Sequence, residues 1–305
     1  MKELLLAFEG GGTKTRIILA ETGGTILQTE TGGSSSALYI DPKKYATTIR
    51  SLLKRLRRTA DKSGGTVVCA GLAAPMDQAL VESLIREAFG DVQLAWLSEA
   101  DIALALYDLS WGISLVAGTG SSCRFLTRDG VTVICGGLGP QFGDEGSGYW
   151  IGKEAIAAAM RAETSQGPPT VLLERLRAFY ELERMWHVLR LCDRSGHVPG
   201  PRVAACVPEV IACARDGDAI ARTVLRHAGR ALGDLVLTTT RKARVKKGPV
   251  PLVLTGGVFR AGALVLNPLK RTLRTSPLAF TMYPEAAEPA SGIIRILSRD
   301  YRKGM

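Results

Sequence analysis

The chain has 305 residues, 46% of them hydrophobic, so it can bury a large core and is long enough for two domains. Its apolar runs have the length of strands, far below the roughly 20 residues of a membrane span. The first residues pass from a short apolar run directly into glycines, unlike a signal peptide, so we expect a cytoplasmic protein without a membrane partner. The net charge of +10 comes without a recognition motif, and we expect no nucleic-acid partner.

The predicted elements start with a β-hairpin and a third strand within residues 2–30, because two apolar runs flank a glycine-rich turn and a second turn follows at Gly23 and Gly24. Periodicity then predicts helices at residues 42–63, 76–89 and 100–107, with strands at residues 65–74 and 93–99.

The plan of the first hairpin returns near residue 113. The sequence ISLVAGTGSSCRF repeats the order of apolar strand, glycine turn and second strand seen in LLLAFEGGGTKTRIIL. Residues 151–244 are mostly helical in pattern, and PLVLTGG then restores a buried strand that ends in glycines. The repeat predicts two similar α/β lobes with a cleft between them.

Three glycine turns follow buried strands: EGGGTKT (residues 9–15, the first glycine turn), AGTGSS (residues 117–122, the second) and TGGV (residues 255–258, the third). Phosphate oxygens reach backbone N–H groups most easily where glycine leaves the approach open, and Thr, Ser and Lys add further donors. Neither the P-loop pattern nor the GxGxxG fingerprint is present. The turns therefore favour a nucleotide held by two hairpins.

Phosphoryl transfer also needs Mg²⁺ and a carboxylate that takes the acceptor's proton. Asp101 stands where a predicted strand gives way to a helix, so it is our candidate base, although an Asp at such a place is often a helix N-cap. Glu99, two residues earlier, is the competing candidate. The six cysteines have no CxxC pair or zinc-like spacing, and we expect free thiols.

Six motifs together resemble one family. EGGGTKT, EADIALAL, SLVAGTGSSCRF, CGGLGPQFGDEGSGYWIG, ARDGDAIAR and VLTGGV occur in the order and spacing of the N-acetylglucosamine kinases and related ATPases of the BadF/BadG/BcrA/BcrD group. The similarity spans residues 3 to about 295. It implies an α/β fold of two actin-like (ribonuclease H-like) lobes, each a mixed sheet flanked by helices, with a cleft between the lobes.

The resemblance also implies roles for individual residues. Asp101 matches the catalytic base, and Glu9 stands where relatives carry an Asp that holds Mg²⁺ through water. The residues expected to bind ATP are Gly10, Gly11, Gly12, Thr13, Lys14, Gly118, Thr119, Gly120, Ser121, Gly217, Gly256 and Gly257. The residues expected to bind the sugar are Ser36, Gly137, Leu138, Gly139 and Asp144.

Two of these positions depart from the family pattern. Ser36 stands where sugar-binding relatives have Asn, and Leu138 replaces the Trp of a GGWG motif. Both changes remove a hydrogen-bonding group from the expected acceptor pocket, since Ser lacks an amide and Leu lacks an indole N–H. The resemblance therefore supports ATP as the donor more strongly than N-acetylglucosamine as the acceptor.

We expect an ATP- and Mg²⁺-dependent kinase that phosphorylates a hydroxyl of an amino sugar or hexose, foremost N-acetylglucosamine or glucosamine, and that forms a homodimer. The expected lobes are residues 1–112 and 113–305, with a helical insertion at about 151–245 and a final helix able to pack back on the first lobe. The alternatives are an activator ATPase of a 2-hydroxyacyl-CoA dehydratase, a sugar-sensing repressor and a non-catalytic binding protein.

Overall fold

The computed structural model of the chain describes residues 2–11, 14–34, 41–73, 77–192, 198–284 and 289–303. The chain divides into two compact units. Unit 1 consists of residues 1–110 together with residues 286–305, and unit 2 consists of residues 111–285. The last helix of the sequence is therefore part of the unit that the first residues build.

Unit 1 contains a mixed five-stranded sheet in the order β3-β2-β1-β4-β5. The first three strands form an antiparallel meander, and β4 and β5 continue the sheet in parallel with β1. Apolar side chains alternate along β1 so that both faces of the sheet are buried. The strands are β1 (Lys2–Gly10), β2 (Thr15–Glu21), β3 (Ile26–Gly32), β4 (Gly65–Ala73) and β5 (Gln93–Trp96).

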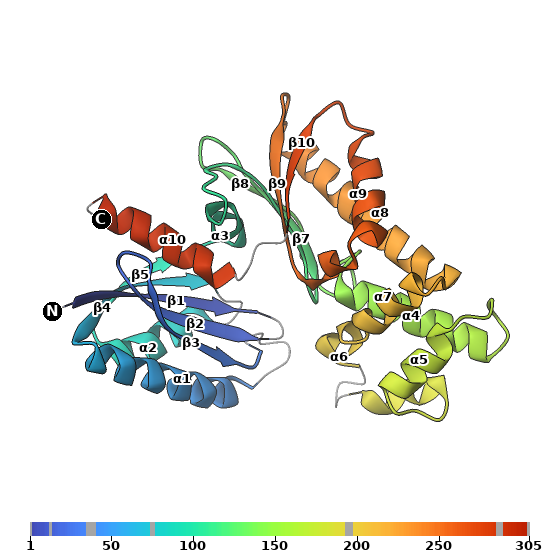
Figure 1. The fold of residues 1–305 in the computed structure, drawn as a ribbon, viewed down its shortest axis with the longest axis horizontal. Helices are drawn as coiled ribbons and strands as arrows, with labels where there is room; N and C mark the ends of the chain where they lie inside the picture. Colours follow the sequence, from blue (N-terminus) through green and yellow to red (C-terminus); the bar gives the residue numbers. More distant parts are fainter. Residues whose placement is uncertain are drawn as a thin grey trace. The chain divides into compact units, whose positions relative to one another are not determined.

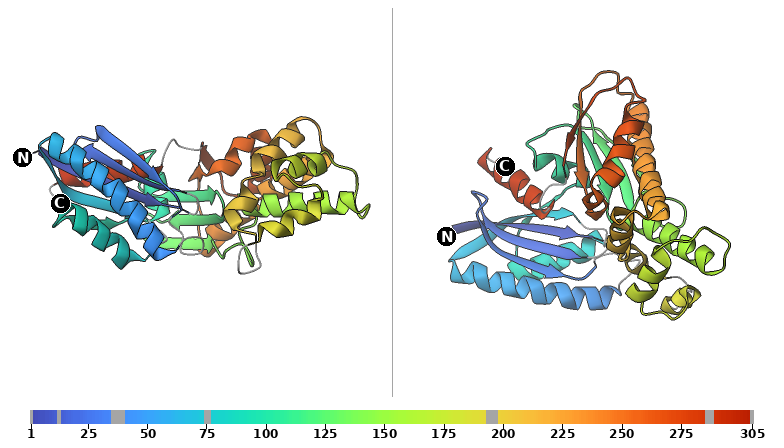
Figure 2. Two further views of the ribbon diagram at one scale, coloured as in Figure 1. Left: turned by 90° about the horizontal axis from the view of Figure 1, so that it is seen from below. Right: turned by 45° about the vertical axis from the view of Figure 1, so that its right-hand side comes forward.

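Helices cover the two faces of this sheet. Leu4, Leu6 and Phe8 point toward the core under α1 and α2, whereas Leu5 and Ala7 point toward the core under α10. Figure 1 shows α10 on one side of the sheet and α1 and α2 on the other, and Figure 2 shows α1 running beside α2. The helices are α1 (Pro42–Lys62), α2 (Gln78–Phe89), α3 (Glu99–Ala105) and α10 (Pro289–Arg302).

Unit 2 repeats this sheet pattern in the order β10-β9-β6-β7-β8. Strands β6, β7 and β8 are antiparallel neighbours, while β9 runs parallel to β6 and β10 runs parallel to β9. The end of β6 and the end of β9 therefore lie at the same edge of the sheet. The strands are β6 (Gly112–Ala117), β7 (Ser121–Leu126), β8 (Thr132–Gly136), β9 (Val250–Thr255) and β10 (Phe280–Tyr283).

The helices of unit 2 pack against one face of its sheet and against one another. Helix α8 runs along α9 and also contacts β6, β7 and β8 (Figure 1). Apolar residues of these helices and of the sheet form one continuous core. The helices are α4 (Gly148–Glu163), α5 (Leu172–Phe179), α6 (Gly200–Ala204), α7 (Val207–Arg215), α8 (Ala219–Lys242), α9 (Ala263–Leu273) and the 3-10 helices η1 (Met185–Leu191) and η2 (Gly257–Ala261).

The prediction of an α/β chain with two mixed, helix-flanked sheets is confirmed, and the duplicated hairpin is the β1-β2 and β6-β7 pair. Strands β8 and β10 and helix α9 were not predicted. All six cysteines are free thiols. Among the described residues, no helix combines the length and the hydropathy that a membrane span requires.

Candidate functional site

The first glycine turn connects β1 to β2. Gly10 pairs with Thr15 across the hairpin, and the Gly11 N–H donates to the Lys14 carbonyl oxygen at 2.8 Å. The buried Thr15 hydroxyl donates to the carbonyl oxygen of Gly33 at 2.9 Å, which ties the hairpin to the end of β3. Gly12, Thr13 and Ser36 lie outside the described residues, so their predicted roles stay predictions.

Glu9 lies one residue before the end of β1 and is the first residue of the first glycine turn. Its register partner on β2 is Arg16, so the two side chains share one face of the hairpin. Mg²⁺ that arrives with a nucleotide needs only one or two protein carboxylates, with water and phosphate oxygens as its other ligands. A single half-buried carboxylate at this place fits that requirement, although the described residues contain no cluster of three or more metal-ligating side chains.

The first turn of α3 carries the two candidate bases. Ser98 is the N-cap, and Asp101 is not the cap itself but its reciprocal partner. Asp101 Oδ2 accepts hydrogen bonds from the Ser98 N–H at 3.0 Å and the Ser98 hydroxyl at 2.6 Å, and the Asp101 N–H donates to Ser98 Oγ at 3.2 Å. The Ser-x-x-acid spacing is a capping-box signature, which could have revealed this role in the sequence. Glu99 exposes its side chain on the same turn.

The second glycine turn joins β6 to β7 and is held by the start of α4. The carbonyl oxygens of Gly118 and Thr119 accept from the N–H groups of Gly148 and Tyr149 at 2.8 and 3.0 Å. In a planar trans peptide the N–H points opposite to the C=O. The N–H groups of Thr119 and Gly120 are therefore turned away from α4.

The third glycine turn packs directly on the second. Gly256 has φ 110°, and a Cβ atom built there would lie 2.4 Å from the Ala117 carbonyl oxygen and 2.8 Å from the Gly118 nitrogen. Only glycine fits this approach. At Gly118 and Gly257, by contrast, an added Cβ would meet no atom of the described residues within 4 Å. The parallel pairing of β6 and β9 thus brings two of the predicted phosphate turns into contact.

Gly217 lies between α7 and α8, with φ 105° and open space around its Cα. The Arg215 guanidinium at the end of α7 donates to the Arg260 carbonyl oxygen of η2 at 3.3 Å. Because η2 begins at Gly257, this hydrogen bond joins the end of α7 to the helix that follows the third glycine turn. The sequence did not indicate this link.

Residues 136–139 start the segment predicted to line the acceptor pocket. Gly136, Gly137 and Gly139 all have positive φ, and the Gly137 N–H donates to the Ser121 carbonyl oxygen at 2.8 Å. The side chain of Leu138 is 71% exposed, and Phe142 in the same segment is 83% exposed. An apolar pair thus stands in solvent next to the second glycine turn, where a ligand could cover it.

Asp144, predicted to contact the sugar, lies against the second glycine turn. It is 7% exposed with φ 59°, and its Oδ1 accepts the Ser121 N–H at 3.3 Å. A Cβ atom at Gly120 would lie 2.8 Å from Oδ2. Burial raises the pKa of the Asp144 carboxyl, the Glu145 charge raises it further, and N–H groups of Ser121 and Gly139 lower it in part. The carboxyl therefore braces the turn.

The raised pKa of Asp144 predicts a pH dependence of stability. A carboxyl whose pKa is higher in the folded than in the unfolded chain stabilises the fold at low pH, and that contribution is lost as the pH rises through the folded pKa. The free energy of unfolding of the wild type, minus that of Asp144→Asn, should therefore be larger at pH 4 than at pH 7. Urea titrations check this, with Asp91→Asn, a change at a fully exposed carboxyl, as the control. If the free energy of unfolding of the wild type, minus that of Asp144→Asn, does not decrease from pH 4 to pH 7, the prediction is wrong.

Within unit 2 the structure thus brings Gly118, Gly120, Asp144 and Gly256 together, and in unit 1 it places Glu9 at the start of the first glycine turn. The residues that sequence reasoning missed are Ser98, Gly148 and Tyr149. Of these, Ser98 had a recognisable signal in the sequence, whereas the α4 contacts depend on the tertiary fold.

The comparisons with known proteins agree with this arrangement. The chain is 29% identical to an N-acetyl-D-glucosamine kinase of Dictyostelium discoideum over 86% of its length and 88% of the relative's. It is 27% identical to an N-acetylmuramic acid/N-acetylglucosamine kinase of Clostridium acetobutylicum, covering 84% of this chain and 85% of that one. A candidate N-acetylglucosamine kinase of Chromobacterium violaceum shares the fold with a TM-score of 0.74 at 22% identity, over 96% of this chain and 98% of the other. The family model of the BadF/BadG/BcrA/BcrD ATPases matches residues 9–291, and the chain belongs to that family.

Proposed function

We propose that the protein transfers the γ-phosphate of ATP to a hydroxyl group of an amino sugar or hexose, with N-acetylglucosamine and glucosamine as the first candidates. The observation that carries the proposal is the second glycine turn, where α4 holds two carbonyl oxygens and turns the N–H groups of Thr119 and Gly120 the other way. The names of the two kinase relatives support the same reaction.

In this proposal the first and the second glycine turns offer backbone N–H groups to phosphate oxygens. Unit 2 provides the second glycine turn, braced by Asp144 and by Gly256. Unit 1 provides the first glycine turn, with Lys14 as a positive charge at its end. Gly217 and Gly257, both with open space around the Cα, are the proposed neighbours of the adenosine. Fixed backbone donors neutralise developing charge without reorganising during the reaction.

The metal in this proposal is the Mg²⁺ ion that accompanies ATP, held by Glu9 through water. When bound, such an ion neutralises phosphate charge and orients the transferred group. Glu9 would position the ion's water shell from the end of β1.

The proposed base is Glu99. Sequence reasoning favoured Asp101. Because one oxygen of the Asp101 carboxylate already accepts two hydrogen bonds from Ser98, we propose instead that Asp101 has a structural task at this helix end. Glu99 is on the same turn, has a longer side chain and is exposed. We assign to Glu99 the acceptance of the sugar hydroxyl's proton, and to Asp101 the positioning of the turn that carries Glu99.

The acceptor is the least constrained part of the proposal. The exposed Leu138 and Phe142 offer apolar contact to a sugar face or to an N-acyl group, whereas Asp144 is largely occupied by backbone N–H groups.

The exposed Val131 and Ile134 at the edge strand β8 support a homodimer as part of the same proposal. We also propose a cytoplasmic location for the protein.

A coupled ADP-release screen tests the reaction. The panel contains N-acetylglucosamine, glucosamine, N-acetylmuramic acid and glucose, each with ATP and Mg²⁺. We expect sugar-dependent ADP release with at least one member. Gly118→Ala should lose most of this activity without a lower urea midpoint, because the added methyl group enters open space that the phosphates need. ATP binding without ADP release from any sugar would instead indicate a non-catalytic binding protein, and sugar-independent ADP release would indicate another kind of ATPase.

A further inference from the structure

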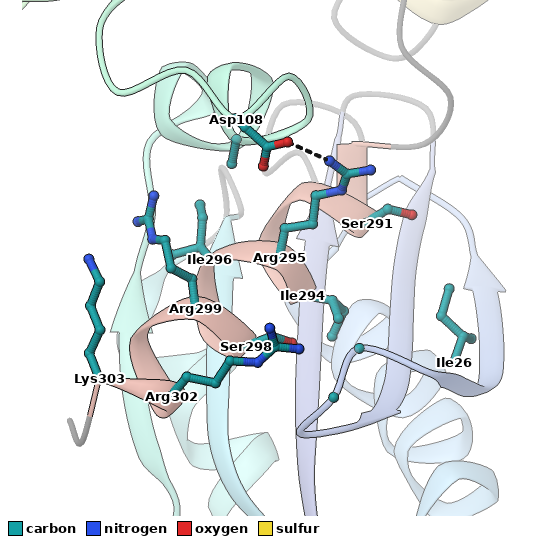
Figure 3. A pocket seen from close by; sticks show the side chains of 13 residues that line it. Ile26, Asp108, Ser291, Ile294, Arg295, Ile296, Ser298, Arg299, Arg302 and Lys303 are labelled. Atoms are coloured by element: carbon teal, nitrogen blue, oxygen red, sulfur yellow. Dashed lines mark ion pairs between the residues drawn. The ribbon is translucent and has the colours of Figure 1, made fainter.

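A cavity of about 610 Å³ lies in unit 1 along α10, and its lining contains none of the residues assigned to the proposed kinase site. One wall is the β2-β3 turn with Gly23, Gly24 and Ile26, and another comes from the end of α3 and the residues after it, with Ala105 and Asp108. Figure 3 shows the side chains of α10 between these walls. A volume of this size is in the range that small-molecule ligands occupy.

The α10 side of the cavity is cationic. Arg295, Arg299, Arg302 and Lys303 all line it, and Figure 3 shows their side chains along α10. Arg295 forms an ion pair with Asp108 at 3.7 Å. Asp108 is the one acidic residue in the lining. Within the described part of the chain, Arg302 and Lys303 have no ion-pair partner.

Ser298 adds a buried donor to this lining. Its side chain is 7% exposed, and its hydroxyl has no hydrogen-bond partner among the described residues. An unsatisfied buried hydroxyl is unfavourable, and an acceptor bound in the cavity would remove that cost. The hydroxyl lies below the β2-β3 turn, where a Cβ atom at Gly24 would be 3.6 Å from Oγ. The lining thus contains guanidinium, ammonium and hydroxyl donors.

Cations at the carboxyl end of a helix also complement its dipole, which explains part of the charge. The dipole explains neither the cavity nor a buried hydroxyl left without an acceptor. We propose that the cavity binds the phosphate group of a small phosphate monoester, with Arg302 and Lys303 pairing with the dianion and Ser298 donating to it. Phosphate fits because arginine forks bind its oxygens in pairs and the lining is rich in donors.

Isothermal titration of the full-length protein tests this site, with glycerol 3-phosphate as the probe and a saturating non-hydrolysable ATP analogue present to occupy phosphate sites elsewhere. Inorganic phosphate, citrate and heparin are the comparison ligands. We expect glycerol 3-phosphate and inorganic phosphate to bind, and the double variant Arg302→Gln, Lys303→Gln to lose at least tenfold in affinity. Ser298→Ala, which changes no charge, should lose about fivefold.

The matched control is the double variant Lys54→Gln, Arg58→Gln, which removes the same charge from exposed positions of α1 in the same unit. It should bind glycerol 3-phosphate as the wild type does. Equal losses of affinity for glycerol 3-phosphate in the two double variants would show that the effect depends only on the net charge of the protein, which would overturn the proposal. Binding of heparin alone, tighter binding of citrate than of phosphate, or an unchanged affinity in Ser298→Ala would overturn it as well.

Discussion

If Glu99 is the proposed base, Glu99→Gln is expected to lower the rate of phosphoryl transfer by about 100- to 10,000-fold, the range for loss of a general base, while ATP affinity and the urea midpoint stay close to those of the wild type. The physical reason is that glutamine keeps the size and exposure of the side chain but cannot accept the proton of the attacking hydroxyl. Steady-state kinetics with the best sugar of the ADP-release screen, together with ATP titration, measure both effects.

Asp101→Asn is the matched comparison on the same turn of α3. Its amide oxygen can still accept from Ser98, so the capping box survives and we expect activity within about tenfold of the wild type. The reverse outcome, a near-complete loss in Asp101→Asn with normal turnover in Glu99→Gln, would restore the sequence-based assignment of Asp101. Normal turnover in both variants would remove this turn from the chemistry.

Gly256→Ala is expected to destabilise the protein by at least about 2 kcal/mol, because overpacking and a positive φ each cost on the order of 1–3 kcal/mol. Its methyl group would lie 2.4 Å from the Ala117 carbonyl oxygen, so the peptide that starts the second glycine turn has to move. ATP affinity should fall together with stability. Urea denaturation and ATP titration of the same preparations check the two losses.

Gly257→Ala is the control for this prediction. It adds the same methyl group one residue later, where no atom of the described part of the chain lies within 4 Å, so its urea midpoint should equal that of the wild type. If Gly256→Ala were as stable as Gly257→Ala, the close packing of the third glycine turn on the second would be wrong. If Gly256→Ala lost stability but kept its ATP affinity, the second glycine turn would have no part in phosphate binding.

The elements that could be predicted were those with strong local signals. Apolar runs separated by glycines gave the β1-β2 and β6-β7 hairpins, and helical periodicity gave α1 and α2. Strands β8 and β10 were missed because they are short strands at the two edges of the sheet of unit 2, and their side chains are half-buried or exposed. Such strands take their conformation from the neighbour they pair with.

The unit to which a helix belongs likewise depends on the tertiary structure. Helix α10 follows unit 2 in the sequence but packs on β1 and β4 of unit 1, with Ile293 and Leu297 in the same core as Leu5. Its amphipathic pattern requires some apolar surface to cover but does not say which sheet provides it. The cationic cavity that we propose as a phosphate site exists only because of this packing.

The sequence by itself determined where the backbone is open enough for phosphate, since glycine has no Cβ atom to block the approach. It also determined that carboxylates stand near strand ends. Only the tertiary structure decided what those groups do. Ser98 engages Asp101 and leaves Glu99 exposed, Asp144 braces the turn at Ser121, and Gly256 packs on Ala117. These last two contacts join residues far apart in the chain, and such contacts depend on strand order and register, which local sequence does not encode.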